Sequence, residues 1–338
     1  MVNFIQSLAK SFVWQANGSV PSVKDLDARH GVIARQDVAP LVGEPAQSLF
    51  VVELAGGKVI GDLRLAATRD DVVVGEMQTI FGSDPANHYA LQRRRLRLAR
   101  HRRGTALLLG AANSDNYYHW SLESLPRWRM AQLAGHQEYD FVLLHSQPRA
   151  FQDEMLDRLG VPEAKRLRCS KNFAHRFDRL ILPAMPSPPW QAKAWVCDWL
   201  RSLFPPGRSG PEKIYLSRSG QQRRRLLNEA ELAIRLKDLG FVTIQPERLS
   251  VAEQAALFSA ARCVVAPHGA GLTNMVFAPP GARLLELFHP QHRNTCYQNL
   301  AAACRQHYAS MDGQEIHSAG SKLLEYRIDV DAVLRALA

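Results

Sequence analysis

A histidine and two glycines follow a short apolar run near the C-terminal end of the chain. Residues 263–277 read Cys-Val-Val-Ala-Pro-His-Gly-Ala-Gly-Leu-Thr-Asn-Met-Val-Phe. The apolar run is typical of a strand buried on both faces, and the residues after it indicate the start of a helix. A strand, a glycine turn and a helix together aim free backbone N–H groups at an anion. We therefore expect an anion site formed by His268, Gly269, Ala270, Gly271 and Asn274.

The two glycines are expected to serve this site in two ways. They let the backbone approach a ligand closely, and they can adopt positive φ. His268 falls at the carboxyl end of the predicted strand, where open α/β sheets bind ligands. The alternative is an ordinary strand-to-helix turn with a buried histidine, because short glycine patterns also occur outside binding sites.

Arginines follow the first predicted strand of the same half of the chain, residues 213–219. A guanidinium group pairs with diphosphate oxygens through two parallel hydrogen bonds. We expect Arg218 and Arg225 to bind such a group. Arg223 and Arg224 are expected to be solvated.

Loops that follow successive parallel strands converge on one edge of a sheet. Asn228 lies near the start of the next predicted helix, and we expect it to contact the same ligand as Arg218 and Arg225. Glu286 lies in the predicted strand 282–288, and its carboxylate can accept hydrogen bonds from ribose hydroxyls.

A second polar stretch, residues 113–127, follows the predicted strand 105–110. His119 and Glu123 are four residues apart and share one helix face. A carboxylate neighbour fixes the tautomer of a histidine, which suits a general base, so His119 is the first candidate for the base and Glu123 the second. The alternative is a core histidine and a surface glutamate on an amphipathic helix.

The remaining polar side chains of this stretch have two expected roles. One of Asn113, Ser114 and Asp115 should cap the helix. The acceptor side or the cleft should be lined by Asn116, Tyr118 and Arg127.

Strands and helices alternate along most of the chain, which predicts a parallel α/β sheet. The clearest linker is the Pro-Pro-Gly-Arg-Ser-Gly-Pro run of residues 205–211. We expect an N-terminal domain of residues 1–205 and a Rossmann-like C-terminal domain of residues 211–338 that lacks the GxGxxG fingerprint. Residues 20–85 read as β-rich, with strands at 49–54, 58–65 and 71–81.

Composition bounds the class of protein. The 338 residues suffice for two domains, and 46% hydrophobic with 22% charged residues is typical of a soluble globular chain. The net charge of +10 favours an anionic partner. Five scattered cysteines form no CxxC pair, which disfavours a zinc site or a disulfide framework and favours a reducing compartment. Asp25-Leu26-Asp27 has the spacing of a metal-binding DxD, but no buried strand precedes it.

The densest basic run, residues 92–103, is interpreted first as a solvated face. It could also contact anionic lipid or a negatively charged acceptor. Residues 1–15 show neither a signal peptide nor a membrane span. A second class of function, a basic protein that binds nucleic acid or another polyanion, is motivated by the net charge of +10 and by residues 93–103, although no nucleic-acid-binding signature is present.

Several ordered motifs carry a family resemblance. They are the segments 215–218 (Tyr-Leu-Ser-Arg), 225–229, 249–254, 268–274 and Glu286-Leu287. Together they look like glycosyltransferase family 61, and residues 116–120 (Asn-Tyr-Tyr-His-Trp) resemble that family's N-terminal signature. The resemblance covers roughly residues 105 to 290.

The resemblance implies an inverting transferase of two-domain GT-B architecture, with Rossmann-like domains facing a cleft, a nucleotide-sugar donor and a glycan acceptor. No metal or other cofactor is expected, and UDP is the expected nucleotide. Because the sequence shows no signal anchor, it resembles the bacterial members that act in capsular or surface polysaccharide synthesis. That implies a cytoplasmic location, with contact to the inner membrane face as an option and no nucleic-acid partner. A catalytically silent sugar-nucleotide sensor is the remaining alternative.

Overall fold

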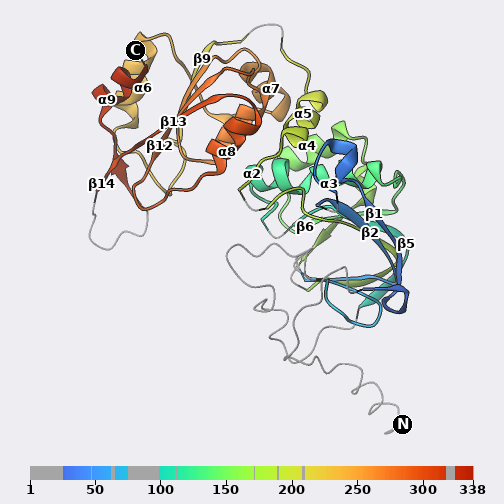
Figure 1. The fold of residues 1–338 in the computed structure, drawn as a ribbon. Coiled ribbons are helices and arrows are strands. Elements are labelled where there is room, and N and C mark those ends of the chain that lie inside the picture. Colours follow the sequence, from blue (N-terminus) through green and yellow to red (C-terminus); the bar gives the residue numbers. More distant parts are fainter. Residues whose placement is uncertain are drawn as a thin grey trace. The chain divides into compact units, whose positions relative to one another are not determined.

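The computed structural model describes residues 26–46, 48–61, 65–74, 99–111, 113–170, 172–188, 190–207, 210–316 and 324–337. The chain divides into two compact units, Met1–Pro189 and Trp190–Ala338 (Figure 1). Several sequence expectations fall wholly or partly outside the described residues. They include the N-terminal segment 1–15, Asp25, residues 92–98 of the basic run, and parts of the predicted strands 58–65 and 71–81 and of the linker 205–211.

Unit 1 is built on one mixed sheet. Its strands are β1 (Val32–Asp37), β2 (Phe50–Ala55), β3 (Lys58–Ile60), β4 (Leu65–Ala67), β5 (Arg100–Leu108), β6 (Phe141–His145), β7 (Arg166–Cys169) and β8 (Ala174–Pro183). The main path is β1-β2-β8-β5-β6-β7, with β3 paired to β8 and β4. The strands β8, β5, β6 and β7 are parallel, whereas β2 joins β8 antiparallel. The β-rich N-terminal segment therefore extends the α/β sheet.

The helices of unit 1 are mostly short. They are η2 (Ala28–His30), η3 (Ala39–Val42), α2 (Tyr117–His119), η6 (Trp120–Ser124), α3 (Pro126–Leu133), α4 (Ala150–Arg158) and η7 (Glu163–Lys165). The sequence predicts a strand over residues 71–81, of which the structure describes residues 71–74. For these four residues the prediction is wrong, because the chain forms a turn and a single bridge between Ala67 and Val73. The reason is that Asp71 adopts a positive φ of 71°, which interrupts an extended strand.

Unit 2 is a parallel α/β unit. Its main strands are β9 (Lys213–Leu216), β10 (Val242–Ile244), β11 (Cys263–Pro267), β12 (Arg283–Phe288) and β13 (His307–Asp312), and β14 (Gln314–Glu315) pairs separately with β15 (Tyr326–Arg327). The order is β10-β9-β11-β12-β13, parallel throughout. Its helices are α5 (Ala194–Leu203), α6 (Glu229–Asp238), η8 (Pro246–Arg248), α7 (Val251–Phe258), η9 (Ala270–Phe277), α8 (Cys296–Ala303) and α9 (Val330–Leu337).

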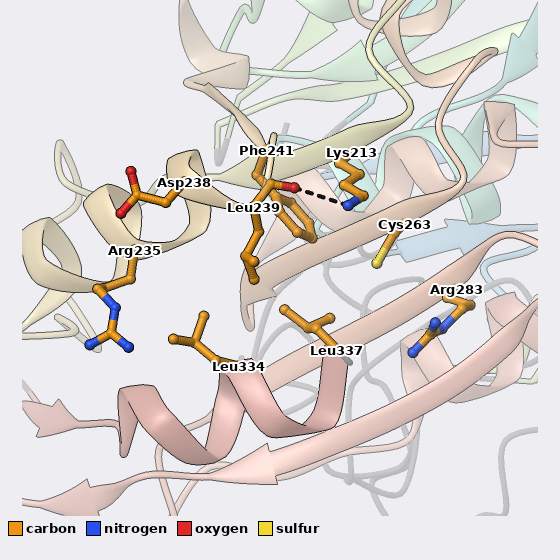
Figure 2. Close-up of a pocket in the computed structure, with 9 residues that line it drawn as sticks. All are labelled: Lys213, Arg235, Asp238, Leu239, Phe241, Cys263, Arg283, Leu334 and Leu337. Carbon is orange, nitrogen blue, oxygen red and sulfur yellow. Dashed lines mark hydrogen bonds between the residues drawn. The ribbon is translucent and has the colours of Figure 1, made fainter.

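Alternating side chains of the unit 2 strands pack against different helices. Tyr215, Val265 and Leu285 share one apolar cluster with residues of α6 and α9. On the opposite face, η9 packs against α5, α7 and α8 (Figure 1). At the amino ends of the strands, α6 and α9 leave a cavity between them (Figure 2).

The domain boundary lies earlier than the linker at 205–211 predicts. Helix α5 belongs to unit 2, which begins at Trp190. Its apolar face buries Val196 and Leu200, and the ring of Phe204 contacts that of Phe277 at 5.6 Å between centroids. Packing against η9 therefore decides which unit holds α5, and the proline-rich linker only connects two elements of that unit.

Each sheet contains a point where the strand order reverses. In unit 2 the chain goes from β9 to β10 on one side, and the later strands add on the other side, beginning with β11. In unit 1 the corresponding point lies between β5 and β8. Open α/β sheets bind ligands outside the carboxyl ends of their strands at such points. Both notable polar stretches of the sequence follow a strand at one of them.

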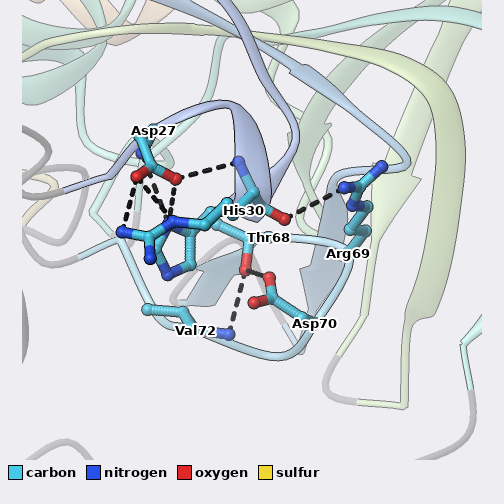
Figure 3. Close-up of polar contacts among 7 residues, drawn as sticks. Asp27, His30, Thr68, Arg69, Asp70 and Val72 are labelled. Atoms are coloured by element: carbon cyan, nitrogen blue, oxygen red, sulfur yellow. Dashed lines mark hydrogen bonds and ion pairs between the residues drawn. The ribbon is translucent and has the colours of Figure 1, made fainter.

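Asp27, the second aspartate of the DxD segment, has a structural role at the start of η2 (Figure 3). Its carboxylate accepts from the backbone N–H of Arg29 at 2.8 Å and contacts the His30 ring at 3.1 Å, closing the cap of η2. The hydrogen bond from the Arg29 side chain lowers the pKa of Asp27 to about 2. Within the described residues, no helix combines the length and apolar character of a membrane span.

Candidate functional site

The guanidinium of Arg218 lies against the backbone of Gly269, across the point where the unit 2 strand order reverses. A Cβ placed on Gly269 would overlap Arg218 Nη1 and would lie 3.0 Å from its Cζ. A Cβ on Gly271 would lie 2.9 Å from Pro246 Cγ. The two glycines thus leave room for neighbouring side chains, since atoms this close leave no space for a methyl group.

The expectation of positive φ at these glycines is wrong. Gly269 has φ of 178°, an extended conformation open to any residue, and Gly271 is not among the glycines with positive φ. Close approach alone explains their small size. The helix that follows these glycines, η9, is a 3₁₀ helix.

A hydrogen bond from its backbone N–H fixes the position of Arg218. Its N–H donates to Glu229 Oε1 at 2.6 Å, and the same oxygen accepts from Tyr215 OH at 3.2 Å. Its Nη2 donates to the carbonyl of Arg223 at 3.3 Å, while Nε is buried without a hydrogen-bond partner among the described residues. Burial lowers the pKa of Arg218, because a desolvated cation is disfavoured.

Two further basic side chains, Arg224 and His292, interact electrostatically with Arg218, and sequence reasoning missed both. Arg224 has φ of 57°, and its pKa is lowered by burial and then by the charge of Arg218. The pKa of His292 is lowered to about 4 by burial, with smaller contributions from Arg224 and His268. His292 lies in the loop after β12, so applying the carboxyl-end rule to every strand would have found it. The conformation that turns Arg224 inward has no signal in the sequence.

His268 belongs to a hydrogen-bonded chain with a buried carboxylate. Its Nδ1 lies 2.5 Å from Glu286 Oε1, and Glu286 Oε2 accepts from Tyr308 OH at 2.8 Å. Asn294 Oδ1 accepts from the backbone N–H of Cys296, which turns Asn294 Nδ2 toward His268 Nε2 at 3.2 Å. These contacts fit the tautomer with hydrogen on Nδ1. Sequence reasoning missed Tyr308 and Asn294.

The Glu286 carboxylate contacts other protein groups, whereas the sequence predicted that it would contact a ligand. Its side chain is fully buried, and both carboxylate oxygens have partners within the protein. It thus orients His268 from behind, whereas the sequence analysis had it accept from ribose hydroxyls. The His268 ring also stacks on Phe288, with 5.1 Å between centroids, so its position is held from two directions.

Three other expected donor-binding residues make contacts inside the fold. Asn228 donates to the carbonyl of Ile328 at 2.9 Å and accepts from its N–H at 3.0 Å. Asn274 is buried and donates to Gln254 Oε1 at 2.5 Å. Exposed Arg225 forms an ion pair with Glu325 at 3.1 Å.

In unit 1, His119 and Glu123 form the pair that their spacing predicted. His119 Nδ1 lies 2.8 Å from Glu123 Oε2, and the two side chains are 17% and 6% exposed. The cap is Asn116, whose side chain accepts from the N–H of Tyr118 at 2.9 Å, and not one of the three residues before it. The wider π-helical turn Trp120–Ser124 follows directly, a feature common at functional sites.

Arg127 has a backbone-binding role that its sequence position did not show. Its Nε donates to Pro183 O at 3.0 Å, and Nη1 reaches Leu109 O at 3.3 Å and Gly110 O at 3.0 Å. It thereby joins the carboxyl ends of β5 and β8. Burial lowers the pKa of Arg127 to about 9. Tyr118 is also buried, with its ring 5.3 Å from that of His119.

Three basic residues of unit 2 share the direction of their pKa shifts. Arg218, Arg224 and His292 all have lowered pKa values, so the protein environment disfavours their positive charge. An anion bound between them would reverse that effect. Among the described residues, no group of three or more His, Cys, Asp or Glu side chains could hold a metal ion.

The contact between Arg218 and Gly269 gives a direct test of the anion site. Gly269→Ala forces the guanidinium to move, so inorganic diphosphate should bind about 10- to 100-fold more weakly, the loss of one charged hydrogen bond. Isothermal titration calorimetry measures this. Gly220→Ala is the matched control, because its Cβ would come no closer than 3.2 Å to Glu247 Oε1. Equal affinity of Gly269→Ala and wild type would contradict the arrangement.

The lowered pKa of His292 predicts a pH-dependent loss of stability. Between its ordinary pKa of 6.5 and the folded value of about 4, the unfolded chain binds a proton that the folded chain does not. Stability should therefore fall as the pH is lowered from 6.5 toward 4. Thermal unfolding of wild type and His292→Asn across this window measures it, and the variant should lose less stability. Parallel losses would show that His292 does not contribute.

Comparison with known proteins places these residues in a family. The glycosyltransferase 61 model matches residues 117–285, half of the chain. That range begins at α2 and ends within β12, so it includes His119, Arg218 and His268.

Three relatives illustrate the similarity. The beta-1,2-xylosyltransferase XAX1 of Oryza sativa subsp. japonica is 40% identical over 78 residues, 23% of this chain and 13% of the relative. Protein O-linked-mannose beta-1,4-N-acetylglucosaminyltransferase 2 of Mus musculus is 38% identical over 97 residues, 27% and 17% of the two chains. The EGF domain-specific O-linked N-acetylglucosamine transferase of Drosophila melanogaster is 32% identical over 123 residues, 35% and 23%.

The chain spans less than a quarter of the length of each of these relatives. All three come from eukaryotes, and their names do not concern capsular polysaccharide. The range matched by the family model nevertheless contains the segments 215–218, 225–229, 249–254 and 268–274. On the strength of the family-model match, this chain belongs to glycosyltransferase family 61.

Proposed function

We propose that the protein is an inverting glycosyltransferase that moves a sugar from a nucleotide diphosphate, UDP, to a hydroxyl group of a glycan. The observation that carries this proposal is the Arg218 guanidinium packed against the backbone of Gly269 at the carboxyl ends of the unit 2 strands. A donor diphosphate supplies the negative charge that pairs with such a guanidinium. Membership of the family and the names of its relatives support sugar transfer.

The diphosphate lies beside Arg218 and Arg224 in this proposal, in contact with the turn from Gly269 into η9. The first N–H groups of a helix have no partner inside the helix and can donate to phosphate oxygens. When the bond between the anomeric carbon and the diphosphate breaks, negative charge develops on the leaving group. Fixed guanidinium groups stabilise that charge without a metal ion, which is why we expect none to be required.

His119 acts as the general base. With Glu123 holding Nδ1, the Nε2 atom takes the proton from the acceptor hydroxyl, whose oxygen then attacks the anomeric carbon opposite the leaving diphosphate. This in-line attack inverts the anomeric configuration. The proposal includes the GT-B arrangement that the resemblance implies, in which base and donor site come from different domains.

The acceptor and the location belong to the same proposal. We retain a capsular or surface polysaccharide as the acceptor and the cytoplasm as the location, with contact to the inner membrane face as an option. The named relatives transfer xylose and N-acetylglucosamine. UDP-xylose and UDP-N-acetylglucosamine are therefore the first donors to assay.

Nucleotide binding should not depend on a metal. Because guanidinium groups supply the positive charge, UDP should bind with a Kd in the micromolar range in chelator, and magnesium should change that Kd little. Calorimetric titration in both buffers measures this, with Arg218→Gln as the variant expected to lose binding. Binding only with magnesium would contradict the metal-free site. No binding in either buffer would contradict UDP as the nucleotide and favour CMP or a polyanion.

Removal of the base should separate turnover from donor binding. His119→Ala should lower sugar transfer by about 10²- to 10⁴-fold, the typical contribution of a general base, with UDP affinity unchanged. His101→Ala is the matched control, since His101 forms an exposed pair with Asp178 at 2.6 Å in the same unit. Near-wild-type transfer by His119→Ala would assign the base to another residue.

A further inference from the structure

A cavity of about 460 Å³ opens at the amino ends of the unit 2 strands, between α6 and α9 (Figure 2). Lys213, Cys263 and Arg283 begin β9, β11 and β12, and in the sheet register Cys263 pairs with each of the other two. Their side chains therefore stand in one row on the same face of the sheet. The proposed diphosphate site lies at the opposite ends of these strands and shares no residue with this cavity.

The positive charges of this row have no carboxylate partner among the described residues. Lys213 Nζ donates to the carbonyl of Leu239 at 2.9 Å, and Arg283 Nη2 approaches the carbonyl of Ala336 at 3.4 Å. Neither carbonyl cancels a full charge, and both cations keep further N–H donors. Cys263 lies between them as a half-buried thiol.

Two further charged residues, Arg235 and Asp238, line the cavity and contribute to its net charge. Arg235 is a third cation, but it forms an exposed ion pair with Asp331 at 3.1 Å. Among the residues that the structure describes, Asp238 is the one carboxylate in the cavity lining, and it is exposed. An excess of positive charge therefore remains, centred on the row at the strand starts.

The remaining wall is apolar. Leu239, Phe241, Leu334 and Leu337 line it, and Figure 2 shows the three leucines between Arg235 and Arg283. Leu239 is 42% exposed, and the α9 leucines are half-buried, so this surface is open to a ligand. The volume falls within the range of small-molecule sites, about 300–1,000 Å³.

A smaller cavity of about 90 Å³ adjoins the first. The two cavities share Cys263, Arg283 and Leu337. The last turn of α9 thus has space on two sides, and an apolar chain could continue past Leu337 along the sheet.

We propose that this cavity binds an amphipathic anion, a carboxylate or phosphate group attached to a slender apolar body. The anionic group lies between Lys213 and Arg283, where charge-assisted hydrogen bonds are available. The apolar body covers Leu239, Leu334 and Leu337. The assignment stands on its own residues and does not depend on the proposed sugar transfer.

Cys263 provides a built-in reporter of occupancy. The other four cysteines are buried, so N-ethylmaleimide should modify Cys263 first in the folded protein. Octyl phosphate, used below its micelle-forming concentration, should slow this reaction about tenfold at ten times its Kd, because only the unoccupied fraction reacts. Mass spectrometry of the modified peptides follows the rate at Cys263 and checks that the buried cysteines stay unmodified.

Three comparison ligands separate the two halves of the proposal. Octanoate tests a carboxylate in place of the phosphate, and the better protector identifies the preferred anionic group. Inorganic phosphate and octanol each lack one half and should protect little. If inorganic phosphate protects Cys263 as well as octyl phosphate does, the proposed apolar contact is overturned. If octanol protects Cys263 equally well, the proposed anionic contact is overturned. Absence of protection by both amphipathic anions would overturn the proposal as a whole.

Variants locate the anionic group. Lys213→Gln and Arg283→Gln should each weaken protection by octyl phosphate about tenfold, the loss of one charged contact, with each rate normalised to the same variant without ligand. Lys237→Ala is the matched control, an exposed lysine in the last turn of α6 that does not line the cavity. Unchanged protection in both glutamine variants would contradict the assignment. UDP binding measured on the same samples keeps this outcome separate from that of the donor site.

Discussion

The close contact between the Arg218 guanidinium and the backbone of Gly269 is the constraint on which the proposed anion site depends. It requires a glycine directly after His268, and it places a cation at the point where the strand order of unit 2 reverses. Because the guanidinium is desolvated, its charge is disfavoured until an anion arrives. Burial also lowers the pKa values of Arg224 and His292, and the charge of Arg218 contributes to both shifts.

Carboxylates behind the cationic and imidazole groups give the site its rigidity. Glu229 holds the backbone N–H of Arg218, and Glu286 holds His268. In unit 1, Glu123 holds His119 in the same manner. In each case the carboxylate is at least nine-tenths buried and fixes a neighbour. Such preorganised groups need no rearrangement when charge develops during a reaction, which is the largest contribution of many active sites.

The buried Arg127 shows that a cation at a strand end can serve the scaffold alone. Its guanidinium donates to backbone carbonyls at the ends of β5 and β8, the reversal point of the unit 1 sheet. Those carbonyls need donors, since an unpaired buried carbonyl is costly. Arg127 lies on α3, which follows the stretch that carries His119, and it ties that part of the chain to the sheet.

The sequence by itself determined the alternation of strands and helices, the glycine turn after β11 and the pair of His119 and Glu123, because each of these follows from local spacing and from side-chain periodicity. The family resemblance was equally local, carried by ordered motifs. Only the tertiary structure decided that α5 packs in unit 2 and that Glu286 lies behind His268. It also decided that Arg224, and not only Arg218, joins the anion site, while Arg225 pairs with Glu325. Neighbouring arginines have the same chemistry, and only the backbone conformation, here a positive φ at Arg224, determines which of them turns inward.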